Sequence, residues 1–554
     1  MQRFSFDFGD PVFRVGDLDL SLQIITFENV YGLDPSRTHV TTTPDGWRIV
    51  ADGLTWAGGQ EHSPGGASIT VGRLGDGSGA DVVVEAHHTS TIRCTKLLVR
   101  GLPSSTLLAR RWEEEPIPSD GVVYQYPGYL RVRDTTVAAP LVFLRPRDGG
   151  AYIAFRSLDD QVRCKRFAFE EADWSTTVEL IHEEAATCMG NRVTVPGWRI
   201  QRTSDPAARV RAHAVDTAQT LGFRRWEERS DVPAWARQVA FVAALHGMHW
   251  SGYVFNTYER MLAVLTWITR RIEGRHVLAY LPGWEGRYYW QYGDFRPDLR
   301  LGGTDGFRRL VDGAHALGVR LMPMYAANSA NAGLPNFEQW GVPARMRTAG
   351  GYVDQGNKPD WDGSRSHDPT WQAILNPGAP TWRARLERQV GELLEMYGLG
   401  DDAVFFDTTH WWQNDPNHAV FDGLVALRDQ LKSRFPNLLF TGEGWYDALG
   451  AVTPVSHSEA HLPVRWADEI FGPYNRYFDH LATGDASRGS TGVHERGTQA
   501  FEVRPLARHR WPTATIVDGT IERAPEQVER LIAQGREYAE RFLSAPLATN
   551  ARSL

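Results

Sequence analysis

The sequence predicts an α/β protein in which an N-terminal antiparallel β-sandwich domain, residues 1–225, precedes a (β/α)8 TIM barrel, residues 226–554. Three observations support this prediction. The chain of 554 residues is too long for one ordinary hydrophobic core. Such a barrel takes about 250 residues and leaves enough chain for a second domain. The first part of the chain is rich in short β-type segments. The second part alternates apolar runs with amphipathic helical segments.

The N-terminal region has the pattern of a β-sandwich. Runs rich in Val, Ile, Phe and Tyr occur at residues 81–85, 141–144, 151–155 and 177–181, and clusters of Gly, Pro and Asp separate them. β-Branched and aromatic residues favour strands, whereas Gly, Pro and Asp favour turns. Helical periodicity of useful length begins only after about Pro206, so we expect strands in this domain.

From about residue 238 the sequence follows the alternation of βα units. Five apolar runs are expected to be barrel strands: 239–245, 276–281, 319–325, 403–406 and 438–441. Amphipathic segments between them end at Gly318, at Gly398 and before Pro436, residue types that commonly stop helices. The remaining strands and the closing helix are placed more loosely, near residues 453–456, 498–503, 513–517 and 524–543.

The composition indicates a soluble globular protein with a neutral partner. Hydrophobic residues make up 42% and charged residues 23%, and the net charge is -8. There is no basic excess to attract nucleic acid or a membrane surface. Some of the 20 Trp and 18 Tyr are expected to stack on sugar rings, although most should fill the core.

The cysteines and the N-terminus suggest a cytoplasmic protein. Cys94, Cys164 and Cys188 cannot all pair and have no CxxC spacing, so neither a disulfide framework nor a zinc knuckle is expected. The N-terminus, MQRFSFDFGDPVF, has neither a basic nor an apolar signal region, and no run approaches the roughly 20 apolar residues of a membrane span. The oligomeric state is left open.

Polar clusters stand where the five predicted strands end. They read HGMHW at 246–250, GWE at 283–285, AAN at 326–328, DTTHWW at 407–412 and GEGW at 442–445. In parallel barrels the side chains that carry chemistry follow the C-terminal ends of the strands. Because those ends share one rim, we expect the five clusters to converge.

Two carboxylates in these clusters are candidate catalytic groups. Asp407 follows the apolar VFF directly, and the next helix begins only near His418, so Asp407 itself is not expected to cap it. Glu443 has the same placement between Gly442 and Gly444, which leave room for a ligand near the backbone. The alternatives are a helix cap for Asp407 and an ion pair with Arg or His for Glu443.

Glycoside hydrolysis requires two carboxylates across one bond. They stand about 5–5.5 Å apart for double displacement and about 6.5–9.5 Å apart when a water fits between them. Adjacent strands lie about 4.8 Å apart, so Asp407 and Glu443 are expected at the shorter separation. The sequence therefore predicts retention of the anomeric configuration. Trp445 is placed to supply an apolar wall that keeps Glu443 protonated.

Five stretches within about residues 276–450 resemble a known group of enzymes: YLPGWEGRYYW, GFRRLVDGAHALGVRLMPMYAANSAN, ILNPGAPTWRARL, DDAVFFDTTHWW and LLFTGEGWY. They are similar to retaining α-glycosidases, most of all to the endo-α-N-acetylgalactosaminidase and intracellular α-N-acetylgalactosaminidase families, and more distantly to the α-amylase-like barrels. The resemblance implies Asp407 as nucleophile, Glu443 as acid/base and an α-linked carbohydrate substrate. The predicted cytoplasmic placement favours small oligosaccharides or glycosides over polymers.

The sequence also departs from related patterns. α-Amylases have an Arg two positions before the nucleophile, where this chain has Phe405. A third carboxylate late in the barrel has only Glu495 and Asp518 as candidates. The β-glycosidase barrels with Asn-Glu on the fourth strand are disfavoured, because this strand ends in Phe-Asp.

Further rim residues are predicted to bind substrate, with packing of the rim as the alternative for each. Tryptophans are placed to stack on sugar rings, and polar side chains to bind hydroxyl groups. The set comprises Trp284, Glu285, Tyr325, Asn328, His410, Trp411, Trp445 and His457.

Two rival functions remain. A metal-dependent hydrolase on the same fold is suggested by His246, His249, Asp407, His410, His457 and Asp518. However, His246 and His249 are three apart rather than two, and on a straight strand they would face opposite sides. A non-catalytic carbohydrate-binding protein is the other alternative, which the two intact carboxylates disfavour. We therefore expect no metal and no cofactor. The sugar, its linkage and the choice between end and internal cleavage stay open.

Overall fold

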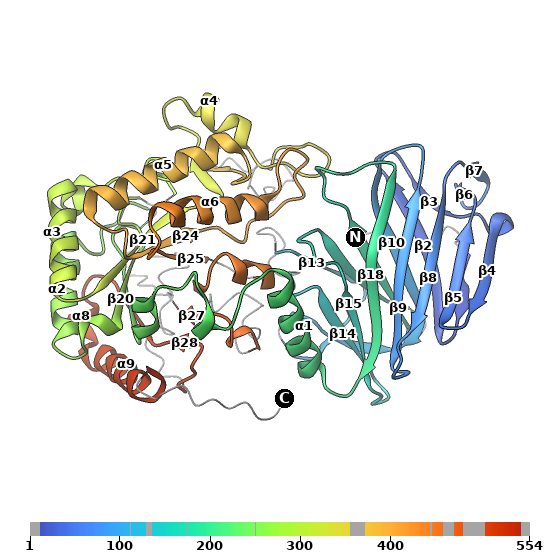
Figure 1. Cartoon of the computed structure of the whole chain (residues 1–554), viewed down its shortest axis with the longest axis horizontal. Coiled ribbons are helices and arrows are strands. Elements are labelled where there is room, and N and C mark those ends of the chain that lie inside the picture. Colours follow the sequence, from blue (N-terminus) through green and yellow to red (C-terminus); the bar gives the residue numbers. More distant parts are fainter. Residues whose placement is uncertain are drawn as a thin grey trace. The chain divides into compact units, whose positions relative to one another are not determined.

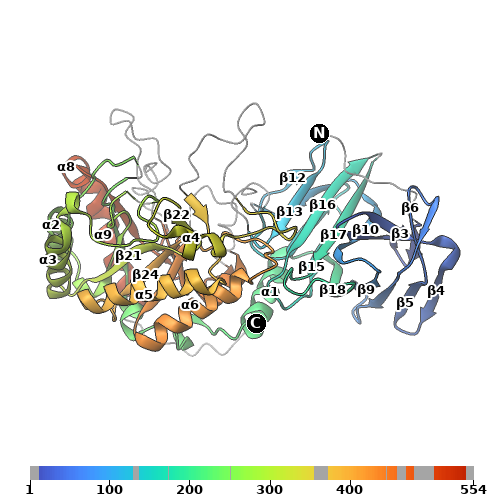
Figure 2. The same cartoon turned by 90° about the horizontal axis from the view of Figure 1, so that it is seen from above.

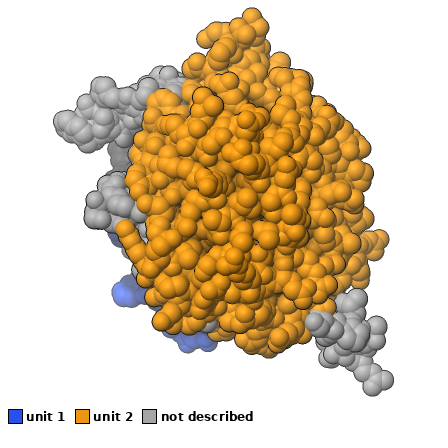
Figure 3. Space-filling model, turned by 90° about the vertical axis from the view of Figure 1, so that its left-hand side faces the viewer, with its two compact units in different colours: residues 1–220, 347–353, 412–419 blue, residues 221–346, 354–411, 420–554 orange. Residues whose placement is uncertain are grey.

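The computed structural model describes residues 11–110, 112–128, 136–172, 174–249, 251–287, 289–354, 372–443, 446–457, 470–479 and 505–543. The chain divides into two compact units (Figure 3). The sandwich unit comprises residues 1–220, 347–353 and 412–419. The barrel unit comprises residues 221–346, 354–411 and 420–554. None of the described helices combines the length and the apolar composition that crossing a membrane requires.

Two antiparallel sheets form the sandwich unit (Figure 1). In the order of pairing, the first contains β13 (Val122–Tyr126), β16 (Lys165–Ala172), β17 (Ser175–Glu183), β10 (Ile92–Pro103), β2 (Leu18–Thr26), β3 (Val30–Leu33), β6 (Leu54–Trp56) and β7 (Glu61–Ser63), with β1 (Phe13–Val15) paired to β2. The second contains β12 (Glu115–Pro116), β11 (Ser105–Leu108), β14 (Leu141–Pro146), β15 (Tyr152–Ser157), β18 (Arg192–Thr203), β9 (Gly79–His87), β8 (Gly66–Arg73), β5 (Gly46–Ala51) and β4 (Thr38–Thr43). Helix α1 (Pro206–Thr220) follows β18.

The sandwich core forms because alternate residues of each strand turn inward. Along β9, for example, Ala80, Val82 and Val84 are buried while the residues between them are partly exposed. Phe167 of β16 meets Trp198 of β18 edge to face, with ring centroids 5.5 Å apart, so side chains of the two sheets interlock. These features confirm the predicted β-sandwich.

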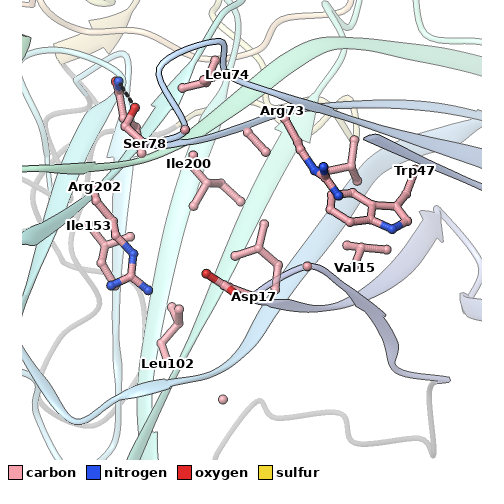
Figure 4. A pocket seen from close by; sticks show the side chains of 18 of the residues that line it. Val15, Asp17, Trp47, Arg73, Leu74, Ser78, Leu102, Ile153, Ile200 and Arg202 are labelled. Carbon is pink, nitrogen blue, oxygen red and sulfur yellow. Dashed lines mark hydrogen bonds between the residues drawn. The ribbon is translucent and has the colours of Figure 1, made fainter. Parts of the chain in front are cut away.

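A cavity of about 590 Å³ opens within the sandwich unit, lined by residues of this unit alone. Figure 4 shows Arg202 and Ile153 on one side of it and Trp47 with Arg73 on the other. The Arg73 guanidinium lies 4.2 Å from the Trp47 ring centroid, a cation–π contact that occupies that face of the indole. The cavity therefore combines aliphatic walls with charged groups.

The sandwich unit buries a complete ion pair. Lys165 is fully buried, and its ammonium lies 3.0 Å from the equally buried carboxylate of Asp159, which Arg163 also contacts at 2.9 Å. Burial opposes ionisation of Asp159, but Lys165 and Arg163 outweigh it and lower the pKa of this carboxyl. Both partners are needed, because either charge alone would be costly in the interior.

Replacing Lys165 by Met should lower the stability of the sandwich unit by about 3 kcal/mol, because the buried charge of Asp159 loses one of its two cations. Urea unfolding followed by circular dichroism measures this loss. The matched control is Arg147→Met, which breaks the half-exposed pair with Glu171 and should cost less than about 1 kcal/mol. Equal losses in the two variants would contradict the expectation.

The barrel unit contains one sheet of parallel strands. In spatial order these are β28 (Arg510–Trp511), β27 (Arg476–Phe478), β26 (Val455–His457), β25 (Leu439–Glu443), β24 (Ala403–Asp407), β21 (Arg320–Ala326), β20 (Val277–Leu281), β19 (Phe241–Leu245) and β29 (Thr513–Ile516). Figures 1 and 2 show helices around these strands: α2 (Tyr258–Thr269), α3 (Gly303–Ala316), α4 (Phe337–Trp340), α5 (Pro380–Tyr397), α6 (Val420–Arg434), α8 (Thr520–Arg523) and α9 (Pro525–Tyr538). A small antiparallel pair, β22 (Ser329–Asn331) and β23 (Gln372–Ile374), is separate from this sheet.

The barrel is closed by one interrupted strand. Only Pro512 separates β28 from β29; β28 pairs with β27, and β29 pairs with β19 at the other end of the sheet. Proline has no N–H to donate to a ladder, but its carbonyl accepts from the Val242 amide at 2.9 Å. The segment from Arg510 to Ile516 therefore acts as the eighth strand, which confirms the predicted (β/α)8 barrel.

The five predicted apolar runs are β19, β20, β21, β24 and β25, and each of β19, β20, β24 and β25 is buried throughout. Strands covered on both faces lack the alternation of polar and apolar residues, which explains their continuous apolar sequences. Of the loosely placed strands, two are β26 and β29, and the one predicted near 498–503 lies outside the described residues. Strand β27 was not predicted, because it is only three residues long.

Candidate active site

Asp407 and Glu443 are the last residues of two neighbouring strands. Strands β24 and β25 run in parallel, with Phe406 opposite Gly442, so both carboxylates emerge at the same rim of the barrel. Their residues are 5% and 6% exposed. The pair is thus nearly enclosed yet retains a route to solvent.

A single backbone amide joins the two carboxylates. The Thr408 N–H donates to Asp407 Oδ1 at 3.0 Å and to Glu443 Oε2 at 2.8 Å. Because both bonds share one nitrogen, these two oxygens lie less than about 6 Å apart, a separation compatible with double displacement. Thr408 has φ of 65°, a conformation that is costly for a β-branched residue and that gathers at functional sites.

Tyr292 holds the second oxygen of Asp407. Its fully buried hydroxyl donates a short hydrogen bond to Asp407 Oδ2. Burial raises the pKa of Tyr292 well above its usual range, and the charge of Asp407 raises it further, so this phenol keeps its proton at neutral pH and donates a hydrogen bond. Sequence reasoning missed Tyr292, because it stands in the aromatic-rich stretch after β20, eleven residues beyond the end of that strand.

Replacing Tyr292 by Phe should reduce kcat by about 10²-fold and leave the fold intact, because Asp407 loses one of the donors that orient and stabilise its charge. Steady-state kinetics and the thermal midpoint measure the two effects. Tyr152→Phe is the matched control, since this hydroxyl bonds an exposed glutamate, Glu114, in the sandwich unit. An unchanged kcat in Tyr292→Phe would show that the contact has no part in the reaction.

Two histidines flank Glu443. His457 Nε2 lies 3.8 Å from Oε1, and His410 Nδ1 lies 4.0 Å from Oε2. The His457 ring stacks on Phe405, with centroids 5.0 Å apart and an interplanar angle of 14°. Phe405, which occupies the position of the amylase arginine, therefore orients an imidazole beside the carboxylate.

Three further predicted rim residues, Asn328, Trp411 and Trp284, have contacts of two kinds. Asn328 donates through Nδ2 to the Trp411 carbonyl at 2.8 Å, and its own N–H lies 3.3 Å from the Thr408 hydroxyl, so Asn328 and Trp411 lie close to Thr408, the residue that follows Asp407. Trp284 is fully buried, stacks on Phe307 at 4.8 Å and donates its indole N–H to a backbone carbonyl, so it packs within the barrel wall.

Trp445 and Glu495, the second of which was a candidate third carboxylate, lie outside the described residues. Asp518, the other candidate, accepts a hydrogen bond from the Tyr253 hydroxyl at 2.7 Å. His249 contacts the Ser251 hydroxyl at 2.7 Å, and His246 meets Phe255 edge to face. In the part of the chain that the structure describes, no three or more His, Cys, Asp and Glu side chains are grouped to hold a metal ion.

Glu285 and Tyr325 are the two other predicted substrate-binding residues, and both are buried. Glu285 is 1% exposed, and burial raises its pKa well above the usual range; its own backbone amide opposes this rise, and the charges of Asp407 and Asp298 add to it. Tyr325 is fully buried, and burial together with the charge of Glu285 raises its pKa. Burial thus favours the protonated form of Glu285.

Comparison with solved structures identifies proteins with the same fold over nearly the whole chain. The α-N-acetylgalactosaminidase NagBb from Bifidobacterium bifidum, in complex with GalNAc, superposes with a TM-score of 0.65 at 14% identity, covering 96% of this chain and 93% of that one. The galactosidase domain of the α-galactosidase–sucrose kinase AgaSK gives 0.51 at 14% identity, covering 95% and 72%. The α-galactosidase from Lactobacillus brevis gives 0.51 at 12% identity, covering 95% and 70%.

No protein-family profile matches the sequence, and no curated protein is detectably similar to it in sequence. The structural likeness, at 12 to 14% identity, establishes the fold: a barrel combined with β-rich structure, shared with enzymes that act on α-linked galactose-type sugars.

Proposed function

We propose that this protein is a glycoside hydrolase that cleaves an α-glycosidic bond with retention of configuration, with Asp407 as nucleophile and Glu443 as acid/base. The observation that carries the proposal is the shared Thr408 amide, which holds one oxygen of each carboxylate within about 6 Å of the other at the ends of adjacent strands. The structural neighbours, whose names describe α-N-acetylgalactosaminidase and α-galactosidases, support the same class of reaction.

In the first step an oxygen of Asp407 forms a bond to the anomeric carbon while the bond to the leaving oxygen breaks. Protonated Glu443 gives its proton to that oxygen, which departs as an alcohol and leaves Glu443 ionised. In the second step Glu443 removes a proton from water, whose oxygen attacks the anomeric carbon and releases Asp407. Two inversions at one carbon restore the original configuration.

The surroundings of each carboxyl suit its role. Asp407 accepts hydrogen bonds at both oxygens, from Thr408 and Tyr292, which stabilise its ionised form for attack. Glu443 ionises when the leaving group departs, and His410 and His457 lie within about 4 Å to stabilise that charge. Each group thus meets partners suited to the charge it carries during the reaction.

We infer a small glycoside or oligosaccharide with an α-linked galactose-type sugar as substrate. The inference rests on the fold shared with α-N-acetylgalactosaminidase and α-galactosidases, since GalNAc is the bound sugar in one of those structures. The 2-acetamido group distinguishes the two sugar types, and both belong in the substrate panel.

The test is a panel of p-nitrophenyl α- and β-glycosides that includes α-galactoside and α-N-acetylgalactosaminide, with the first-formed anomer followed by NMR. The proposal expects hydrolysis of an α-glycoside and initial release of the α-anomer. Initial release of the β-anomer from that α-glycoside would exclude double displacement by Asp407 and Glu443. Absence of hydrolysis across the panel would exclude the function.

A further inference from the structure

The cavity in the sandwich unit has the size of a ligand pocket. Its volume is about 590 Å³, whereas the interiors of proteins contain few voids larger than a water molecule. Pockets that hold small ligands commonly measure about 300–1,000 Å³. The cavity is therefore too large to be a packing defect, and its walls indicate what it can hold.

The cavity lies between the two sheets of the sandwich. Val15 of β1 and Leu102 of β10 belong to the first sheet, and Ile200 of β18 belongs to the second. Two hairpin turns bound it, one between β1 and β2 and one between β8 and β9. A Cβ atom at Gly79 would lie 2.0 Å from the Ile200 carbonyl oxygen, so no side chain can stand there to fill the space. Glycine occupies four of the lining positions: Gly16, Gly77, Gly79 and Gly101.

The floor of the cavity is aliphatic. It consists of six buried residues from five strands: Val15, Val71, Ala80, Leu102, Ile153 and Ile200. None of the six is more than 7% exposed. Apolar walls of this kind bind an apolar group, because it displaces water that makes no hydrogen bonds with them. The floor therefore favours a hydrocarbon part in the ligand.

The rim of the cavity is charged, and it comprises the exposed residues Asp17, Arg73 and Arg202. None of the three forms an ion pair with another residue in the described ranges of the chain. Arg73 rests on the Trp47 ring, and Figure 4 shows Arg202 on the opposite side, near Ile153. Two guanidinium groups against one carboxylate leave the rim positive, which favours an anionic group in the ligand.

A sugar fits these walls poorly. Stacking on a sugar ring needs an open aromatic face, but Arg73 covers one face of Trp47, and a Cβ atom at Gly16 would lie only 3.0 Å from the indole. Gln201, a buried polar residue of the lining, already donates its amide to the Ser78 hydroxyl at 2.7 Å. The walls thus disfavour a ligand that carries many hydroxyl groups.

We propose that this cavity is a binding site for an amphipathic anion, an aliphatic carboxylate whose chain lies on the apolar floor and whose carboxylate pairs with Arg202. A guanidinium group can bind a carboxylate through two parallel hydrogen bonds, and Arg73 adds a second positive charge at the rim. The site is additional to the proposed glycoside hydrolysis and does not depend on it, because the residues that line the cavity belong to the sandwich unit.

Isothermal titration calorimetry of the full chain with octanoate tests the site. Wild type should bind one equivalent of octanoate saturably. Arg202→Gln should bind it at least about 10-fold more weakly, because a charge-assisted pair is lost at an exposed position that the fold does not need. Octan-1-ol has the same chain without the charge, so it should bind wild type more weakly than octanoate does. Its affinity should be the same in Arg202→Gln.

Two further variants locate the binding. Leu74→Trp places a larger side chain at a half-buried position of the lining, in the turn between β8 and β9, and should abolish binding of both octanoate and octan-1-ol. Arg48→Gln is the matched control, because this exposed arginine follows Trp47 in β5 and points to the other face of the sheet. Its affinity for octanoate should equal that of wild type. Equal thermal midpoints show that the variants are folded.

Octanoate that binds wild type and Arg202→Gln equally well would overturn the proposal, as would the absence of saturable binding to wild type. Octylamine bound as tightly as octanoate would also overturn it, since the rim would then not select an anion. Binding of methyl α-galactoside that is lost in Leu74→Trp would assign the cavity to a sugar instead. None of these measurements involves hydrolysis, so their failure leaves the proposed function untouched.

Discussion

Replacement of Asp407 by Ala should lower kcat by at least about 10⁴-fold, because the glycosyl-enzyme intermediate can no longer form. The loss should appear in kcat rather than in KM, since Asp407 forms its bond to the sugar only as the reaction proceeds. The fold should survive, because the side chain lies at the end of β24, beyond the buried run Val404–Phe406 that holds the strand. Single-turnover kinetics on the best aryl α-glycoside and circular dichroism measure the two effects.

External azide tests from which side of the sugar the nucleophile is missing in Asp407→Ala. The space left by the Asp407 carboxylate admits a small anion, which can attack the anomeric carbon from the same side as the missing group. An α-glycoside should then yield a β-glycosyl azide, which NMR identifies by its anomeric proton. Asp401→Ala is the matched control: this exposed residue precedes the same strand and contacts Asn437 at 3.1 Å, and its loss should leave kcat unchanged. An α-glycosyl azide would contradict the assignment of Asp407.

Replacement of Glu443 by Ala should slow hydrolysis by an amount that depends on the leaving group. Substrates that leave as alkyl or sugar alcohols need protonation and should lose about 10³-fold or more in kcat/KM. Dinitrophenyl glycosides leave as stable anions, so their first step should fall by less than about 10-fold. The glycosyl-enzyme should then accumulate, because the second step lacks its base, and a burst of dinitrophenol reports this accumulation.

The pH profile supplies an independent readout for Glu443. The alkaline limb of kcat/KM for an alkyl glycoside reflects loss of the acid's proton, and it should disappear in Glu443→Ala. Glu395→Ala is the matched control, because this exposed residue lies in helix α5 and pairs with Arg434. Equal losses for alkyl and dinitrophenyl substrates would show that Glu443 is not the acid.

The barrel was predictable because its signals are local. The runs that became β19 to β21, β24 and β25 are apolar throughout, and helices α3, α5 and α6 stop at or before Gly318, Gly398 and Pro436 as predicted. The short strand β27 was not predictable, because three residues, Arg476–Phe478, carry too little pattern to mark a strand. Closure through Pro512 was equally hidden, since proline normally argues against a sheet interior.

By itself the sequence determined that Asp407 and Glu443 end adjacent strands, because strand ends and their order follow from apolar periodicity along the chain. Tertiary structure alone decided what surrounds them. Tyr292 reaches Asp407 across 115 residues of sequence, and Thr408 joins the two carboxylates only because its backbone is held at positive φ. Burial and the charge of Asp407 raise the pKa of Glu285, and both depend on the folded structure. Hydrogen bonding and desolvation depend on distances in space, which the spacing of residues along a chain does not specify.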